Sequence, residues 1–209
     1  MKVPYRQTEI PTLVRIDVAD PPERWGDLGF TVTDSSLNLG GVRVAFGVAG
    51  HGITSWEIDG IPEGTRAIDG LATTPVRSHP QQTGGTHPNG AVGIDQVVIT
   101  TPDFDRTAIA LEQNAMPLKR IRDAGTFRQG FRRLGPAILE LVEVPNAPPG
   151  PATFWGLAVI VSDLDALASR LGDRLAAAKP AVQPGRRIAT LRDTAGLSTK
   201  LAFMDPEGP

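Results

Sequence analysis

The sequence predicts an α+β fold of repeated βαβββ modules whose mixed, curved sheets form a cleft. The first observation is a repeat: one strand, one helix and three strands follow one another in 93–144 and in 152–209, with a weaker copy in 1–60. The second is composition, because 23 glycines and 19 prolines occur among the 209 residues. Both residue types disrupt helix interiors, which argues against a long helical bundle. Short helices set among strands satisfy both observations.

The middle module, 93–144, shows the repeat most clearly. An apolar run over 94–100 predicts its first strand, and Thr101 or Asp103 can cap a helix that continues to Gln113. Three strand-like runs follow, over 118–122, 127–134 and 137–144. The order is one complete βαβββ unit.

The last module, 152–209, repeats this order. Its first strand is expected over 157–161, and Ser162-Asp163 marks the start of a helix. Leucines at helical spacing give that helix one apolar face, namely Leu164, Leu167, Leu171 and Leu175. Three strands are expected near 181–182, over 187–191 and over 199–203.

The first segment, 1–60, is a poorer copy of the same unit. A strand over 13–18 leads into a short helix over 19–25 with proline at its start. Strand-like runs follow over 30–32, 42–48 and 53–58. We expect an N-terminal module that resembles the other two.

The segment 61–92 differs from the rest of the chain. It has no aromatic residue and is rich in glycine, proline, threonine and glutamine, which predicts a linker between 1–60 and the paired modules of 93–209. A shorter proline-rich hinge over 144–151 separates 93–144 from 152–209.

A βαβββ unit leaves one sheet face apolar and does not bury it alone. Two of the three copies can pair within the chain. The third must pack elsewhere on the chain or against another chain, so a homodimer is one expected arrangement.

Composition excludes several classes of protein. Without cysteine there is no disulfide scaffold, thiolate zinc site or cysteine nucleophile. A net charge of −2 gives no general attraction to nucleic acid or to an anionic membrane. No run is long and apolar enough for a membrane span, and the start lacks the apolar stretch of a secretory signal, so we expect a cytoplasmic protein.

Several short motifs resemble the vicinal-oxygen-chelate superfamily, which includes glyoxalase I, bleomycin-resistance proteins and extradiol dioxygenases. The opening of the middle module, 93–106 (GIDQVVITTPDFDR), resembles the start of a module of that superfamily. The run 27–32 (DLGFTV) resembles its passage from helix to second strand, and 139–143 (LELVE) its closing strand. The run 154–166 resembles the start of the next module. The resemblance implies paired βαβββ modules around a cleft.

The resemblance also implies a divalent metal held by side chains of the first and last strands of each module. Those positions correspond to Gln96 and Glu140 in the middle module. In the last module they fall on Gly156 or a neighbour and on Lys200, neither of which ligates a cation, whereas Glu57 of the first module could supply a third ligand. The alternative for Gln96 and Glu140 is a pair of polar residues that face a wet cleft or hydrogen-bond each other.

Other residues are candidates for binding or chemistry. Glu140, if partly desolvated, would have a raised pKa suited to proton abstraction. Arg128, Arg186 and Arg187 could hold a carboxylate, phosphate or enolate oxygen of a small ligand, or could protect exposed strands. Trp155 could stack on a planar ligand or belong to the core.

Two functions remain open at this point. One is a glyoxalase-like enzyme, a lyase, isomerase or dioxygenase relative that acts on a small oxygenated molecule through Glu140 and a weakly held metal. The other is a metal-free protein that sequesters a small ligand, as drug-resistance members of the superfamily do.

Overall fold

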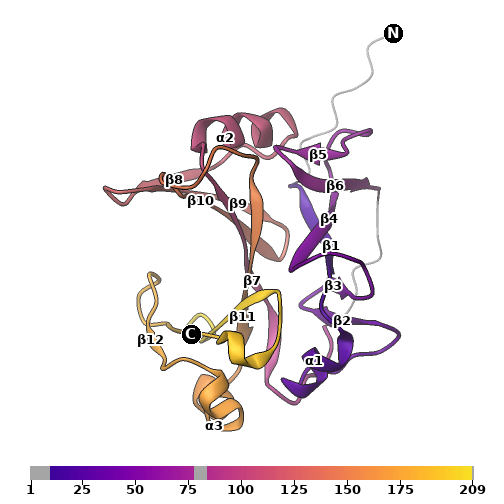
Figure 1. The fold of residues 1–209 in the computed structure, drawn as a ribbon, viewed down its shortest axis with the longest axis vertical. Helices are drawn as coiled ribbons and strands as arrows, with labels where there is room; N and C mark the ends of the chain where they lie inside the picture. Colours follow the sequence, from indigo (N-terminus) through magenta and orange to yellow (C-terminus); the bar gives the residue numbers. More distant parts are fainter. Residues whose placement is uncertain (1–9, 78–83, 209) are drawn as a thin grey trace.

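The chain forms two mixed β-sheets stacked face to face, with short helices at the two ends (Figure 1). The computed structural model describes residues 10–77 and 84–208, so the parts of the predicted N-terminal module and linker that fall on 1–9 and 78–83 lie outside the described residues. The α+β class with mixed, curved sheets is confirmed. No helix of the described ranges is both long and apolar enough to cross a bilayer.

The eight-stranded sheet contains both modules of 93–209. Its centre is an antiparallel pair, β7 (Ala91–Thr101) and β11 (Thr153–Val161). Each has a parallel neighbour, β10 (Ala137–Glu143) beside β7 and β14 (Lys200–Met204) beside β11. The outer strands are β9 (Arg128–Leu134), β8 (Arg120–Asp123), β13 (Arg187–Thr190) and β12 (Lys179–Pro180). The order is β12-β13-β14-β11-β7-β10-β9-β8, which is two βαβββ units joined by their first strands.

The helices of these modules begin where the sequence predicts. Asp103 caps α2 (Phe104–Gln113) and accepts a hydrogen bond from the Arg106 amide. Asp163 caps α3 (Leu164–Leu171) and accepts one from the Ala166 amide. Helix α3 ends before Leu175, the last residue of its expected apolar face, because Gly172 has a φ of +55° and a 3₁₀ turn, Gly172–Arg174, follows. Another 3₁₀ turn, Asp193–Ala195, precedes β14.

The six-stranded sheet is built differently from the predicted first module. Its elements are β1 (Thr12–Val18), α1 (Pro22–Asp27), β2 (Ser36–Leu39), β3 (Val42–Ala45), β4 (Ile53–Asp59), β5 (Ala67–Ile68) and β6 (Leu71–Val76), in the strand order β2-β3-β1-β4-β6-β5. The strand that runs parallel to β1 is β3, whereas β4 is antiparallel to it. Strand β6 is in turn parallel to β4. The six-stranded sheet thus has the same arrangement as the larger one, a central antiparallel pair in which each strand has a parallel neighbour, but with fewer outer strands.

The predicted linker over 61–92 differs from the structure as well. It contributes β5, β6 and the beginning of β7. Ile68 and Leu71 are buried, so this glycine- and proline-rich segment still places side chains in the core. The predicted strand over 30–32 is irregular backbone. Phe30 is nevertheless buried, with its ring centroid 6.2 Å from that of Phe203.

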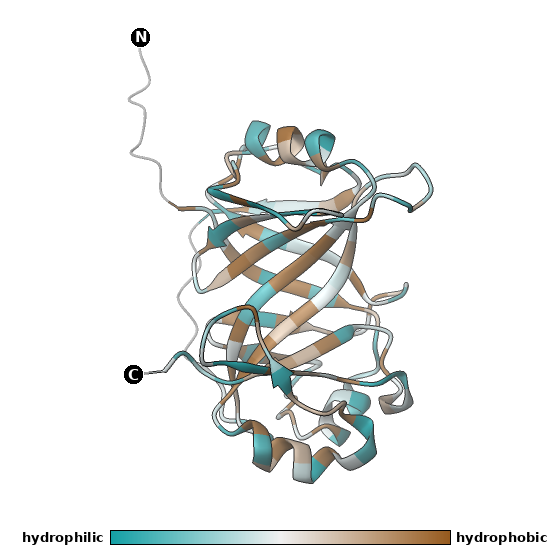
Figure 2. Cartoon of the chain, turned by 90° about the vertical axis from the view of Figure 1, so that its left-hand side faces the viewer, coloured by the Kyte–Doolittle hydropathy of each residue, from teal (hydrophilic) through white to brown (hydrophobic). Residues whose placement is uncertain are grey.

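The two sheets bury their apolar faces against each other. Trp56 on β4 meets Phe154 on β11 edge to face, with ring centroids 5.2 Å apart. Alternation along β7 sends Val97 and Ile99 into this core and leaves Gln96 on the opposite face. The N-terminal segment thus covers the helix-bearing face of the eight-stranded sheet within the same chain. The homodimer, the other arrangement expected for this segment, stays a prediction. The opposite face is the one seen from the left of Figure 1 and drawn in Figure 2.

Asp20 joins the two sheets at the α3 end of the molecule. Its carboxylate accepts hydrogen bonds from the Ser198 hydroxyl at 2.7 Å and from the Thr199 amide at 3.1 Å. The indole of Trp25 donates to the same group at 3.3 Å. Burial alone would raise the pKa of Asp20, but these hydrogen bonds outweigh it and hold the pKa below its ordinary value.

We expect Asp20→Ala to lower the free energy of unfolding at pH 7 by about 3 kcal/mol, because it leaves buried donors without an acceptor. A carboxyl with a depressed native pKa stabilises the fold above its unfolded pKa and loses that effect as pH falls through the native value. The difference between wild type and variant should therefore narrow below about pH 4. Urea unfolding at pH 7 and pH 3 measures both effects, with the exposed Asp27→Ala as a control that should change neither.

Candidate functional site

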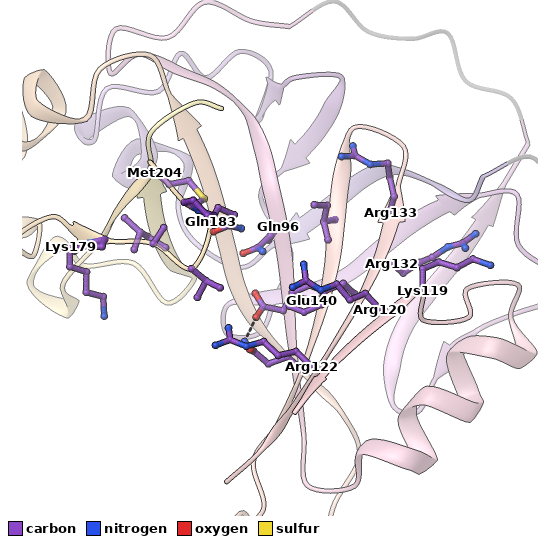
Figure 3. Close-up of a pocket in the computed structure, with 18 residues that line it drawn as sticks. Gln96, Lys119, Arg120, Arg122, Arg132, Arg133, Glu140, Lys179, Gln183 and Met204 are labelled. Carbon is purple, nitrogen blue, oxygen red and sulfur yellow. Dashed lines mark hydrogen bonds between the residues drawn. The ribbon is translucent and has the colours of Figure 1, made fainter. Parts of the chain in front are cut away.

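A cleft of about 790 Å³ lies on the face of the eight-stranded sheet that the six-stranded sheet leaves open (Figure 3). Strands β8 and β9 form one wall, and the β12–β13 hairpin forms the other. Strands β7, β10 and β14 supply the floor through Gln96, Ile138, Glu140 and Met204. The two modules thus enclose a space of the size that small-molecule sites occupy.

Gln96 and Glu140 meet on this floor, as their alternation predicts. Gln96 lies opposite Ile138 in the parallel β7–β10 pair, and Glu140 lies opposite Val98, so both side chains point to the cleft. Gln96 is only 9% exposed, and its amide has no hydrogen-bond partner among the described residues. Glu140 accepts a hydrogen bond of 2.6 Å from the amide of Gln129 on β9.

The surroundings of Glu140 favour its protonated form. Burial raises the pKa of this carboxyl above its ordinary value, and the nearby Asp95 carboxylate adds to the effect. The hydrogen bond from Gln129 and the positive charge of Arg122 act in the opposite direction and are outweighed. A carboxyl with a raised pKa in a cleft is suited to taking up and returning a proton.

The walls of the cleft are strongly basic. Six residues with cationic side chains border it, namely Lys119, Arg120, Arg122, Arg132, Arg133 and Lys179, whereas Glu140 is the one acidic residue among the described residues that line it. Of the six, Arg132 lies opposite Leu139, so its side chain points to the other face of the sheet. Within the described ranges none of the six makes an ion pair, although the Arg120 guanidinium lies over the Phe131 ring. Concentrated unpaired charge of one sign in a concave site attracts ions of the opposite sign. In a chain of net charge −2, this concentration marks the cleft as a site for anions.

The structure places Arg128 on the opposite face of the sheet. Its guanidinium pairs with Glu143 at 2.9 Å and with Asp105 of α2 at 2.8 Å. It also lies over the Phe104 ring, 4.5 Å from the centroid. Arg128 therefore fastens the start of α2 to the sheet and does not reach the cleft.

Arg187 occupies the equivalent position in the other module. It pairs with Asp205 at 2.8 Å and with Asp165 of α3 at 2.9 Å. In both modules the carboxylate at the end of the last strand also accepts from the arginine's own backbone amide. The repeat thus includes a clamp between helix and sheet, which accounts for two of the predicted ligand-binding arginines.

The remaining predicted residues are also spread out. Arg186 is buried beneath the cleft, where it pairs with Asp95. Trp155 is 39% exposed and does not line the cleft. Glu57 lies on the outer face of the six-stranded sheet, where it pairs with Arg15 at 3.7 Å, so it does not join Gln96 and Glu140.

The donor set does not fit a divalent metal. The pairing of β11 with β14 makes Ala202 the counterpart of Glu140, and not the predicted Lys200, because Ala202 lies opposite Ala158 as Glu140 lies opposite Val98. The counterpart of Gln96 is Gly156, so the second module offers no ligand. Within the described ranges no three His, Cys, Asp or Glu side chains are grouped to hold a metal. Two oxygen donors beside several cations make a poor cation site.

Sequence reasoning missed the wall cations and Asp95. Arg120 and Arg122 share a face of β8 because they lie opposite Phe131 and Gln129 of β9. The period-two spacing of these arginines was available in the sequence as a signal. Asp95 gave no such signal, since it reaches the cleft side through an irregularity in strand pairing.

No family model matches the chain, and no curated protein matches it. Among solved structures it is similar to methylmalonyl-CoA epimerase from Mycobacterium tuberculosis, with 21% identity over 59% of this chain and 94% of that one, and a TM-score of 0.49. The corresponding enzyme of Streptomyces coelicolor, solved as a variant with 2-nitronate-propionyl-CoA, shows 17% identity over 55% and 97%, with a TM-score of 0.45. A Bacillus halodurans protein shows 14% identity over 56% and 95%, with a TM-score of 0.46. The paired βαβββ modules support the resemblance to the vicinal-oxygen-chelate superfamily at the level of fold.

Proposed function

We propose that the cleft binds a small oxygenated molecule with at least two negative charges, and that Glu140 exchanges a proton with it without a resident metal. The observation that carries the proposal is the position of Glu140, a half-buried carboxyl on the floor of a cleft whose walls carry cations without ion-pair partners among the described residues, such as Arg120, Arg122 and Lys179. The cations supply the attraction for anionic groups, and the carboxyl supplies the chemistry.

The site suits removal and return of a proton at a carbon beside a carbonyl. The Glu140 carboxylate takes the proton, and the C–H electron pair moves onto the carbonyl oxygen as an enolate. The same carboxyl then returns the proton to a conjugated carbon of the enolate, which isomerises the molecule, or to the other face of the same carbon after the enolate has turned, which inverts that carbon. The free amide of Gln96 and the cations of the cleft can stabilise the developing negative charge. One carboxyl is sufficient, so the reaction class is isomerisation or racemisation.

A second candidate is sequestration of the same kind of anion without turnover. The hydrogen bond from Gln129 favours it, because it occupies one oxygen of Glu140. The apolar side chains of Ile138, Val182 and Met204 beside the cations would suit the uncharged part of such a ligand. The two candidates predict the same binding but differ in proton exchange.

Calorimetry with 2-oxoglutarate and a malonyl thioester tests the binding step. We expect affinity that falls with salt and is unchanged by a chelator, and the double variant Arg120→Gln/Arg122→Gln should weaken binding about tenfold or more, because charged hydrogen bonds are lost. Arg66→Gln/Arg77→Gln removes the same charge from exposed positions outside the cleft and should leave affinity within about twofold. Equal losses in both double variants, or loss of binding with the chelator, would contradict the proposal.

A further inference from the structure

A buried ion pair lies at the foot of the hairpin wall. Arg186 Nη1 is 2.9 Å from Asp95 Oδ1, and the two side chains are only 4% and 7% exposed. Arg186 Nε also donates to the carbonyl of Asp205 at 2.8 Å. One guanidinium therefore connects the hairpin with the floor strand β7 and with the end of β14.

Asp95 reaches this position through a β-bulge. Gln96 pairs with Ala158 of β11, but Ile94 pairs with Val159, so Asp95 is an extra residue without a partner in the ladder. A bulge re-aims a side chain relative to regular alternation. The Asp95 carboxylate is thus next to Gln96 in the chain and near enough to Glu140 to raise the pKa of that carboxyl.

Two polar atoms of this buried ion pair lack hydrogen bonds. Asp95 Oδ2 and Arg186 Nη2 are buried and have no hydrogen-bond partner among the described residues. The neighbouring Arg187 shows the contrast, because its side chain hydrogen-bonds both oxygens of two carboxylates. A buried ion pair with unmet polar atoms contributes little net stability. Stability alone therefore does not explain why this pair is beneath the cleft.

We propose that Asp95 and Arg186 are positioning residues, whose bond holds the hairpin over 179–186 against the floor and fixes a negative charge beside Glu140. The hairpin supplies six residues of the cleft lining, 179–184, and its turn is closed by a hydrogen bond from the Ala181 amide to the Arg186 carbonyl. Release of Arg186 would free this wall from β7. We call the attachment of the hairpin to β7 by Asp95 and Arg186 the latch. The role of the cleft rests on the proposed function, whereas the latch rests on the geometry of the ion pair.

The charged groups that face Glu140 come from three sides. Asp95 is on β7 and Arg122 is on β8. The other cations that border the cleft are Lys119, Arg120, Arg133 and Lys179, together with Arg132, whose side chain points to the other face of β9. Of these groups Asp95 is the one that adds negative charge, so its removal should make Glu140 ionise at lower pH.

The variants Asp95→Asn and Asp95→Asn/Arg186→Gln test the latch in the full chain. In both we expect the titration midpoint of the Glu140 carboxyl, followed by carbon-13 NMR, to move to lower pH. Exchange of the Ala181 amide with deuterium should accelerate, and the malonyl thioester should bind about tenfold more weakly as the wall moves. The double variant should regain thermal stability that the single variant loses, because no uncompensated charge stays buried.

Asp165→Asn is the matched control, since it weakens the adjacent Arg187 pair on the opposite face, at an exposed residue of α3, and should leave all three measurements unchanged. Where Asp95→Asn does not fold, the double variant and Arg186→Lys carry the comparison. A folded double variant with unchanged Glu140 titration and Ala181 exchange would overturn the inference. Shifts in both measurements without any binding of the probe by wild type would overturn the proposed function and leave the latch in place.

Discussion

Replacement of Gly156 by alanine should unfold the chain or lower its free energy of unfolding by at least about 3 kcal/mol. A Cβ at this position would lie 2.1 Å from the carbonyl oxygen of Lys200 and 2.8 Å from its carbonyl carbon. The obstacle is the backbone of β14, so no side-chain rotation relieves it. Because the β11–β14 pair links the hairpin wall to the rest of the sheet, we expect ligand binding to fail together with stability.

Gly26→Ala is the control for this prediction. Gly26 lies in α1, and nothing is within 4 Å of the Cβ it would acquire. Alanine in a helix interior is favoured over glycine by about 1 kcal/mol, so this variant should be as stable as wild type or more stable. Urea unfolding of both variants measures the difference. Similar stability of the two would mean that β14 does not approach β11 as closely as the structure shows.

Glu140→Gln should slow proton exchange on a bound 2-oxo acid or malonyl thioester by about 10²–10⁴-fold, because the amide does not accept the proton. Binding should change much less, since the cations of the cleft remain. The exchange is measured by the loss of the substrate C–H signal in deuterated buffer.

Glu57→Gln makes the same chemical change on a strand outside the cleft and should leave exchange unaffected. The free energy of unfolding of Glu140→Gln tests the raised pKa of Glu140 separately. A carboxyl whose native pKa is raised binds protons more readily in the folded chain, so its contribution to stability falls as pH rises through its ordinary pKa toward the native value. Glu140→Gln should therefore be at least as stable as wild type at neutral pH. Equal exchange rates in wild type and Glu140→Gln would favour sequestration.

The paired modules could be predicted because their signals are local. Asp103 and Asp163 are helix caps that stand directly before apolar helical patterns, and β9 and β10 between them pair without a register shift. The same alternation placed Gln96 and Glu140 on one face of adjacent strands. These features depend on near neighbours in the chain, which a single sequence reports directly.

The six-stranded sheet could not be predicted in the same way. Whether β4 runs parallel or antiparallel to β1 depends on a contact between segments about 40 residues apart. Strand β5 has two residues, and β6 ends among proline and arginine, so neither carries a strong periodic pattern. Burial between the sheets, and not local propensity, decides their conformation.

The arginines show a different limit. Alternation assigned Arg128 to one face of its strand, but it does not reveal which face a helix covers. The structure shows that Arg128 and Arg187 face the helices and meet their first-turn aspartates, Asp105 and Asp165. Asp95 escaped prediction because a bulge changes the face of a single residue.

The most direct test of the account is a nitrogen-15 NMR titration of the full chain with a malonyl thioester, in the presence of a chelator. We expect the resonances that move to cluster in the cleft, including the side-chain amides of Gln96 and Gln129 and the backbone of 120–122 and 179–184. The resonances of β1 and β4, on the far side of the molecule, should stay in place. Shifts concentrated on β1 and β4, or binding that needs an added metal, would contradict it.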